Sequence, residues 1–332
     1  MRAALFLCLG VVLSLAFIVR EYLKPYFDDS LKEEFADFNV ITDRASVPFE
    51  GARVTFLGVS TLLIDDGVTQ LMVDGFLTRP SFTDVFFSKI ETDQKLVNSI
   101  LVNLKINRLK AIFVTHSHYD HALDAVYIAK KTGAQLHGSP STYNLGLGGD
   151  IERQLHLFAA SEKLVFGDFV VEIFPSVHSE PGISLFDDRD KPIKSALSQP
   201  LWFAKYSEGG SYDVRISHPT GSIFVKPSAN IGSADFDPGS IDLMFFGTTR
   251  LGSYDPEFRD DIYEQIVARI KPRIVIPVHW DNFLLPLSPN LQPLNAHDFR
   301  AAFDFLSKRL RSDGIEFRIL DGYQRITLLH EE

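Results

Sequence analysis

Three histidines and an aspartate follow directly on a short, mostly apolar strand pattern in the first half of this chain. The strand pattern is 111–115 (AIFVT), and the next residues read HSHYDH. We expect His116 and His118 to point the same way, because side chains two apart in an extended segment share a face. Asp120 and His121, on the turn into a helix, can face a second ion nearby. Imidazole nitrogens and carboxylate oxygens are ligands that Zn²⁺ accepts, so the segment predicts a metal centre.

Two more histidines stand in matching positions, each at the end of a predicted strand. His178 ends the run VEIFPSVH, and His279 ends the run RIVIPVH. We expect both to join the metal centre, because ligands at strand ends can meet at one edge of a sheet. Cys8 is the only cysteine of the chain, which excludes a thiolate cluster and an intramolecular disulfide.

Composition and charge narrow the functional class further. The chain has 332 residues, of which 45% are hydrophobic and 23% charged, as in ordinary globular proteins. The formal net charge is −10, and such an acidic balance argues against a nucleic-acid partner, which needs a basic surface. We therefore expect a globular protein without a nucleic-acid partner.

The N-terminus carries an apolar run that predicts contact with a membrane. Residues 3–19 contain no charged side chain, and Arg2 precedes them. Their length is at the lower limit for spanning a bilayer. We expect residues 1–24 to be a membrane anchor, with the membrane face undetermined; a cleaved signal, which would mean export, and a buried helix are the alternatives. Residues 25–50 are expected to connect this segment to one domain over 51–332.

The order of elements predicts the architecture of that domain. Strands come first and then alternate with helices, which favours two sheets packed face to face with helices outside. The expected strands are 53–57, 61–64, 70–73, 111–115, 135–137, 164–166, 169–174, 214–226 as a hairpin, 242–246, 273–278, 316–320 and 324–329. The expected helices are 92–106, 120–131, 256–270 and 296–311, and Gly133 is expected to end the second of them.

These motifs together resemble the metallo-β-lactamase superfamily of metal-dependent hydrolases, over about residues 51–330. Within it the chain is most similar to the branch of N-acyl-phosphatidylethanolamine phospholipase D and ascorbate-6-phosphate lactonase. The resemblance is carried by the segments FLGVSTLLID, LMVDGFLTRPS, VTHSHYDHALDA, SVHSEPGISLFDDRD, PLWFAKY, GSIFVKPSAN and IPVHWDNF. It implies an α+β fold of the αββα sandwich type.

The resemblance also implies a division of the ligands between two metal ions. The first ion would be held by three histidines, His116, His118 and His178. The second would be held by Asp120, His121 and His279. Asp74, at the end of LMVD, looks like a carboxylate that orients one of the ligand histidines.

One departure from the family pattern bears on the number of ions. The family places a bridging Asp after the second hairpin strand, where this chain has Ser228 and Ala229. Asp235 or Asp237 could supply the carboxylate instead. Without it, two dications would repel each other with less negative charge between them. One ion, two ions bridged by hydroxide, and a degenerate centre all stay open.

The resemblance implies that a metal-bound hydroxide hydrolyses a phosphodiester, a lactone or a related ester. The substrate would be a small-molecule or lipid-like ester. Zn²⁺ is the expected cofactor, as one or two ions, with Mn²⁺ or Fe as alternatives. Asp120 would orient the attacking water or carry a proton besides acting as a ligand. A non-catalytic, regulatory metal domain is the second hypothesis. Oxygen chemistry at a di-iron centre is the third, and it ranks last because His118 stands where such centres carry Glu.

Overall fold

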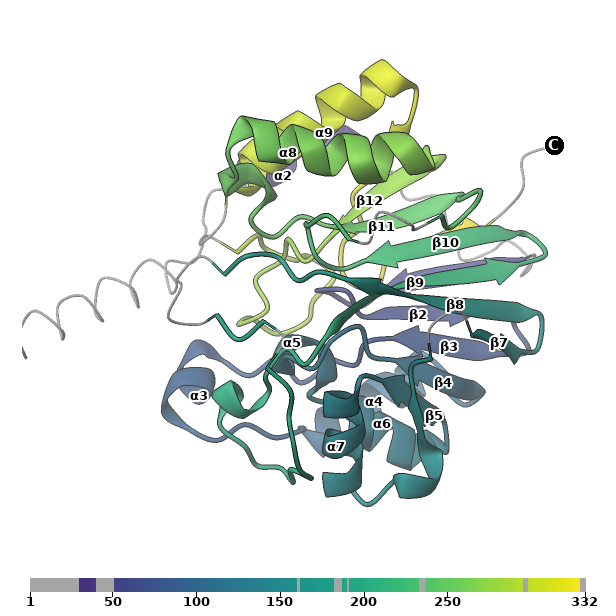
Figure 1. Ribbon diagram of the computed structural model, residues 1–332, viewed down its shortest axis with the longest axis vertical. Helices are drawn as coiled ribbons and strands as arrows, with labels where there is room; N and C mark the ends of the chain where they lie inside the picture. Colours follow the sequence, from purple (N-terminus) through teal and green to yellow (C-terminus); the bar gives the residue numbers. More distant parts are fainter. Residues whose placement is uncertain are drawn as a thin grey trace, which may run out of the picture.

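Two seven-stranded sheets pack face to face, and helices cover their outer faces (Figure 1). This arrangement is seen in a computed structural model, which describes residues 30–39, 51–159, 162–181, 187–189, 191–232, 237–294 and 298–328. The αββα sandwich predicted from the sequence is therefore confirmed over these residues.

The first sheet carries the strand that leads into the histidine cluster. Its strands are, in spatial order, β14 (Arg325–Leu328), β1 (Ala52–Phe56), β2 (Leu62–Asp65), β3 (Gln70–Val73), β4 (Leu109–Phe113), β5 (Gln135–Gly138) and β6 (Leu155–Leu157). Neighbours from β14 to β3 are antiparallel, and neighbours from β3 to β6 are parallel. The sheet is therefore mixed, and its parallel half brings the ends of β3, β4 and β5 to one edge.

The second sheet has the same mixed character. Its strands are, in spatial order, β13 (Glu316–Phe317), β12 (Ile274–Val278), β11 (Leu243–Gly247), β10 (Gly221–Lys226), β9 (Ser211–His218), β8 (Phe169–Ser176) and β7 (Lys163–Phe166). Strands β10 to β13 pair in parallel, whereas β7 to β10 pair antiparallel. His178 and His279 come shortly after the ends of β8 and β12.

Helices lie on both outer faces of the sandwich, and 3₁₀ turns join several of the elements. The α-helices are α2 (Ser30–Glu34), α3 (Phe82–Phe87), α4 (Gln94–Asn103), α5 (Tyr119–Ala122), α6 (Ala125–Thr132), α7 (Pro140–Gly148), α8 (Pro256–Ile262) and α9 (Phe299–Asp313). The 3₁₀ turns are η1 (Ala36–Phe38), η2 (Glu152–Gln154), η4 (Phe203–Lys205) and η5 (Leu251–Ser253). A π-helical segment, η6 (Tyr263–Ala268), continues α8. In Figure 1, α8 and α9 lie beyond the second sheet, while α4, α6 and α7 lie beyond the first.

The main core fills the space between the sheets. Phe113 of β4 meets Phe166 of β7 edge-on, with ring centroids 5.9 Å apart. Phe56, Phe169 and many aliphatic side chains of both sheets belong to the same buried cluster. A second cluster joins the first sheet to α4 and α6. Burial of this much apolar surface is the dominant stabilising contribution, and it holds the strand ends in place.

The predicted helix 120–131 is broken into α5 and α6, and Asp124 explains the break. Its buried carboxylate accepts hydrogen bonds from the backbone N–H groups of Leu77 and Thr78, at 2.6 and 2.7 Å. These bonds pin the turn after Val73 to the start of α6, at the expense of a continuous helix. The second helix ends at Gly133, which has a left-handed φ of 77°, as the sequence predicted.

Part of the predicted connecting segment 25–50 is folded onto the domain. Leu31 and Phe35 lie one helical turn apart and are buried in the main core. The Lys32 ammonium pairs with Asp321 at 2.7 Å. Residues 30–39 are thus part of the domain surface, because an i, i+4 apolar pair can seat even a short helix.

Residues 3–19, the predicted membrane anchor, lie outside the described residues. In the part of the chain that is described, no helix is long and apolar enough to cross a membrane.

Candidate metal centre

The histidine motif begins where β4 ends, at the edge of the first sheet. Thr115 donates its backbone N–H to Asp74 at 2.7 Å, and Ser117 donates its N–H to the carbonyl of Glu208 at 3.0 Å. The chain then turns, and His118 precedes the first residue of α5. These contacts fix the backbone of the motif to the ends of β3 and β9.

The first three predicted ligands come together as one group. His116, His118 and His178 each offer a nitrogen, and the three nitrogens lie within 4.8 Å of one another. The ring centroids of His116 and His118 are 4.8 Å apart, and those of His116 and His178 are 4.7 Å apart. Three imidazoles at this spacing can grip one ion.

The other three predicted ligands form a second group. Ligand atoms of Asp120, His121 and His279 also lie within 4.8 Å of one another. Oδ2 of Asp120 is 3.2 Å from Nε2 of His279 and 3.8 Å from Nε2 of His121. His279 has a left-handed φ of 59°, and its N–H donates to the carbonyl of Val59 at 2.7 Å. The bond to Val59 helps to hold the ring of His279 at the site.

The two groups are adjacent, and their nitrogens are poorly satisfied by protein alone. The rings of His116 and His121 have centroids only 3.8 Å apart. Nε2 of each is buried without a hydrogen-bond partner among the described residues. A buried, unsatisfied polar atom costs about 1–3 kcal/mol. A metal ion would satisfy both atoms, so this donor set fits a metal centre.

The remaining ring nitrogens have defined partners. Nδ1 of His121 lies 2.8 Å from Oδ2 of Asp74, and Nδ1 of His178 lies 2.7 Å from the carbonyl of Ser179. Each partner accepts a hydrogen bond from Nδ1–H, so both histidines have Nε2 left to bind a metal. Asp74 thus lies against the ring of His121, one of the histidines predicted as ligands.

The carboxylate of Asp74 is held in place by several hydrogen bonds. Its carboxylate accepts hydrogen bonds from the hydroxyl groups of Ser60 and Thr115 as well as from the Thr115 N–H. It also has a left-handed φ of 56°, a conformation that Asp tolerates better than most residues. This network fixes the carboxylate before any metal binds.

Electrostatics in the site favour neutral imidazoles around an anionic carboxylate. Burial and the neighbouring histidines hold the pKa of His116 well below its usual range, and burial lowers the pKa of His178 to about 3. Burial would raise the pKa of Asp120, but His121 and His279 outweigh it and lower that pKa below its usual range. Burial would lower the pKa of His121, but Asp74 and Asp120 together raise it. The protonation states of His116, His178 and Asp120 are those that metal binding requires.

Comparison with known proteins shows which family this chain is similar to. A family model described as the metallo-β-lactamase superfamily matches residues 54–193. A UPF0173 metal-dependent hydrolase from Carboxydothermus hydrogenoformans is 26% identical over 70% of this chain and 85% of its own length. One from Staphylococcus aureus is 24% identical over 70% of this chain and 87% of its own length. The prediction of a metal-dependent hydrolase is confirmed at this level.

Solved structures show a similar fold at low sequence identity. A "possible metal-dependent hydrolase" from Veillonella parvula aligns with a TM-score of 0.51 and 16% identity, over 84% of this chain and 100% of that chain. CmlA, a diiron β-hydroxylase from Streptomyces venezuelae, aligns with a TM-score of 0.52 and 15% identity, over 91% of this chain and 59% of that chain. At such identities the likeness concerns the fold alone.

The position of the superfamily's bridging Asp is filled by small residues here. Ser228 and Ala229 follow β10 and are buried. Asp237 is exposed, and its carboxylate accepts a hydrogen bond from Gly239 in a turn; Asp235 lies outside the described residues. Asn230 donates its side-chain amide to the carbonyl of His178 at 2.8 Å. In the described part of the chain, this segment therefore holds His178, a predicted ligand, without adding a carboxylate to either group.

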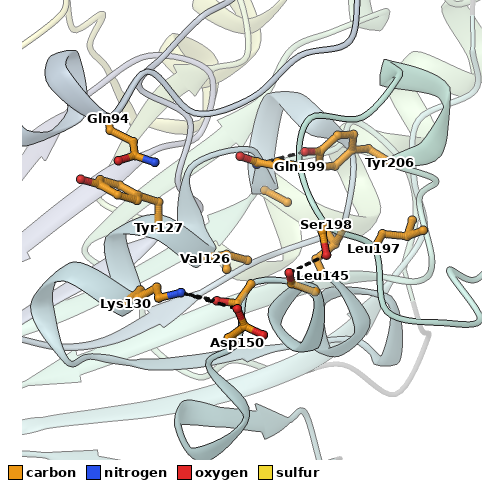
Figure 2. Close-up of a pocket in the computed structure, with 13 residues that line it drawn as sticks. Gln94, Val126, Tyr127, Lys130, Leu145, Asp150, Leu197, Ser198, Gln199 and Tyr206 are labelled. Carbon is orange, nitrogen blue, oxygen red and sulfur yellow. Dashed lines mark hydrogen bonds and ion pairs between the residues drawn. The ribbon is translucent and has the colours of Figure 1, made fainter.

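A cavity of about 350 Å³ opens beside the candidate metal centre. His118 and Asp120 lie on its wall, together with Tyr119, Phe203 and Phe283. A second cavity, of about 400 Å³, lies on the other side of Tyr206 and is shown in Figure 2. None of the predicted ligands lines that second cavity, and its Gln199 and Tyr206 already bond to each other at 3.0 Å. The first cavity is the candidate substrate site.

One functional candidate was missed when the sequence was read. Asp188 lies beside His118, with Oδ1 3.0 Å from Nε2. The only signal in the sequence was the segment LFDDRD, which resembled the phospholipase and lactonase branch without assigning a role to its carboxylates.

Proposed function

We propose that this protein is a metal-dependent hydrolase that cleaves a phosphodiester, a lactone or a related ester. The observation that carries the proposal is the convergence of the six predicted ligands into two adjacent groups of three. The finer likeness to the branch of N-acyl-phosphatidylethanolamine phospholipase D and ascorbate-6-phosphate lactonase supports these bond types. It belongs to the same proposal.

The chain's own residues would prepare the centre before the reaction. Asp74 holds the ring of His121, and the carbonyl of Ser179 holds the ring of His178, so that both Nε2 atoms face inward. Such preorganisation avoids reorientation during the reaction. When bound, Zn²⁺ or a similar ion supplies Lewis acidity and lowers the pKa of water from about 15.7 towards about 7.

Asp120 has the position for a second role. It bonds towards His279 and also lies on the wall of the 350 Å³ cavity. A carboxylate there could orient the attacking water and accept its proton. The leaving group would receive its proton from the same side of the cavity.

Part of the wall of this cavity is aromatic, which favours a substrate with an apolar part. Rings of Tyr119 and Phe203 have centroids 6.3 Å apart, and Phe203 contacts Phe86 at 5.3 Å. Phe86 and Trp202 are 39% and 44% exposed, so the aromatic surface continues to the outside. We infer a substrate whose apolar group packs on this wall while its ester faces His118 and Asp120. A lipid-like ester meets this description.

A metal and turnover assay tests the proposal. Metal content per chain is measured on the parent protein and on His118→Ala and His279→Ala, each assayed with bis(p-nitrophenyl) phosphate and with an alkyl-substituted lactone. His156→Ala is the control, because His156 is exposed and outside both groups. We expect one or two ions per parent chain, and turnover that both site variants lose and the control keeps. Metal binding without turnover on either probe would favour the regulatory alternative, and no metal would refute the proposal.

The N-terminal anchor is a separate proposal, supported only by the apolar run 3–19. Expression of the full chain followed by membrane fractionation tests it, with a chain beginning at residue 25 as the comparison. Sedimentation of the full chain with membranes is expected, and equal solubility of the two chains would contradict it.

A further inference from the structure

The carboxylate of Asp188 joins the metal motif to a distant segment of the chain. Its Oδ1 lies 3.0 Å from Nε2 of His118, and its Oδ2 accepts the backbone N–H of Glu208 at 3.3 Å. The Asp188 side chain is 27% exposed, so most of it is shielded by its neighbours. Two groups that lie 70 and 20 residues away in sequence therefore meet on one carboxylate.

This contact decides which nitrogen of His118 is available. Nε2 is directed at an anionic oxygen and so carries the proton, which leaves the Nδ1 lone pair for a metal. His118 then follows the same rule as His121 and His178, whose outward nitrogens are held by Asp74 and by the Ser179 carbonyl. His118 thus joins them in having its outward nitrogen held by a fixed acceptor.

Asp188 and Glu208 each make further hydrogen bonds that hold them in place. The carbonyl of Asp188 accepts the N–H of Lys191 at 2.9 Å. Glu208 is tied to the motif by its carbonyl, which accepts the N–H of Ser117 at 3.0 Å. Its own carboxylate is occupied by the Gly210 N–H and the Ser211 hydroxyl. Glu208 therefore contacts Ser117, and Asp188 contacts the next residue, His118.

Charge gives the contact a second consequence. The group of His116, His118 and His178 contains only imidazoles, whereas the other group includes the carboxylate of Asp120. Asp188 puts a negative charge directly behind one of these three imidazoles. An anion in that position makes the imidazole a stronger donor to a dication.

We propose that Asp188 is a positioning residue, which orients His118 and strengthens the binding of a metal ion by His116, His118 and His178. The proposal rests on the proposed function in that it takes these three histidines as ligands. Its neighbour Asp187 has a different task, because both of its oxygens bond to Arg189, at 2.9 and 2.7 Å. Asp187 therefore serves as a matched control.

The first test needs no metal. In the metal-free protein, a hydrogen-bonded imidazole N–H exchanges slowly and is visible in the downfield proton NMR spectrum. The His118 signal is assigned by its loss in His118→Gln. We expect it in the parent, in Asp187→Asn and in Asp188→Asn, which keeps one acceptor oxygen, and we expect it to vanish in Asp188→Ala. A signal that survives in Asp188→Ala, that vanishes in Asp187→Asn, or that is absent from the parent would overturn the proposal.

The second test measures metal affinity by competition with a chromophoric chelator, using Co²⁺ so that the d–d spectrum also reports ligand geometry. We expect Asp188→Ala to weaken the binding of one ion by about 10–100-fold and to shift the spectrum. Asp188→Asn should fall between, and Asp187→Asn should match the parent. Parent-like affinity in Asp188→Ala would overturn the proposal.

These two tests separate the proposal from the proposed function. If the parent binds metal and shows the Asp188 effects but hydrolyses no probe, the positioning role holds and hydrolysis is wrong. If the parent hydrolyses the probes and Asp188→Ala changes neither the N–H signal nor the affinity, hydrolysis holds and the positioning role is wrong.

Discussion

Oδ2 of Asp74 lies 2.8 Å from Nδ1 of His121, and neither side chain has any exposed surface. The aspartate comes directly after β3 and the histidine stands in α5, so the contact ties the end of one strand to the helix that follows the next strand. Because the buried Asp74 oxygen accepts a hydrogen bond from Nδ1 of His121, the other ring nitrogen, Nε2, faces the interior of the site. Removal of that acceptor is the most direct probe of the second group of ligands.

Asp74→Asn should therefore weaken one metal site and leave the other intact. The amide keeps the size of the side chain and tolerates the left-handed backbone, but it removes the charge behind His121. We expect the affinity for one of two ions, or for the single ion if it sits there, to fall by about 10–100-fold. Metal titration by calorimetry measures this. Asp150→Asn is the control, since Asp150 is 89% exposed, and parent-like binding by Asp74→Asn would contradict the prediction.

Metal removal should lower the melting temperature. The buried Nε2 atoms of His116 and His121 have no protein partner among the described residues, so an ion that binds them stabilises only the folded state. At free metal 100 times the dissociation constant, one site adds about 2.7 kcal/mol to the free energy of unfolding. Differential scanning fluorimetry with and without chelator tests this. His116→Ala should lose most of the effect, and a parent protein indifferent to chelator would refute it.

Breaking the buried ion pair between Arg79 and Asp281 should destabilise the fold. Arg79 and Asp281 pair at 2.5 Å with no exposed side-chain surface, and Asp281 also accepts the Val59 N–H at 2.8 Å. Asp281→Ala leaves a buried guanidinium without its counter-charge. We expect the free energy of unfolding in urea to drop by about 3–5 kcal/mol.

The double variant Arg79→Met with Asp281→Leu provides the comparison. Because it removes both charges together, it should be less destabilised than Asp281→Ala alone. A double variant less stable than Asp281→Ala would contradict this prediction. It would mean that burying the two charges costs less free energy than their mutual attraction contributes.

His137 should make the protein sensitive to acid. Burial, with a smaller effect of His156, lowers the pKa of His137 to about 3. Below about pH 6.5, His137 is protonated in the unfolded chain. In the folded chain it stays neutral down to about pH 3. The free energy of unfolding therefore falls as the pH falls, by about 1.4 kcal/mol per unit and about 2 kcal/mol by pH 5.

His137→Phe removes that contribution, and its ring suits a site beside Phe113 and Phe166. Urea unfolding of parent and variant at pH 7 and pH 5, both with chelator, isolates the difference. The variant should lose about 2 kcal/mol less than the parent over this interval. Equal losses would show that His137 takes up its proton without unfolding.

Much of the architecture could be predicted because its signals are local. The apolar runs around β3, β4, β8 and β12 have strand length, and Gly133 ends α6 where the sequence placed the end. The helices and the strand that were missed, α2, α3, α7 and β6, are short or weakly periodic. The break at Asp124 was missed for another reason, since it depends on hydrogen bonds to residues 77 and 78, which lie far away in sequence.

The sequence by itself determined the chemical kinds of the ligands and the register of the motif, because spacing within one segment dictates which side chains share a face. Only the tertiary structure decided that His178 and His279 reach that motif, that Asp74 and Asp188 stand behind two of its rings, and that residues 30–39 pack on the domain. The physical reason is that these contacts join segments whose separation along the chain says nothing of their distance in space. Strand pairing and the burial of the core bring them together.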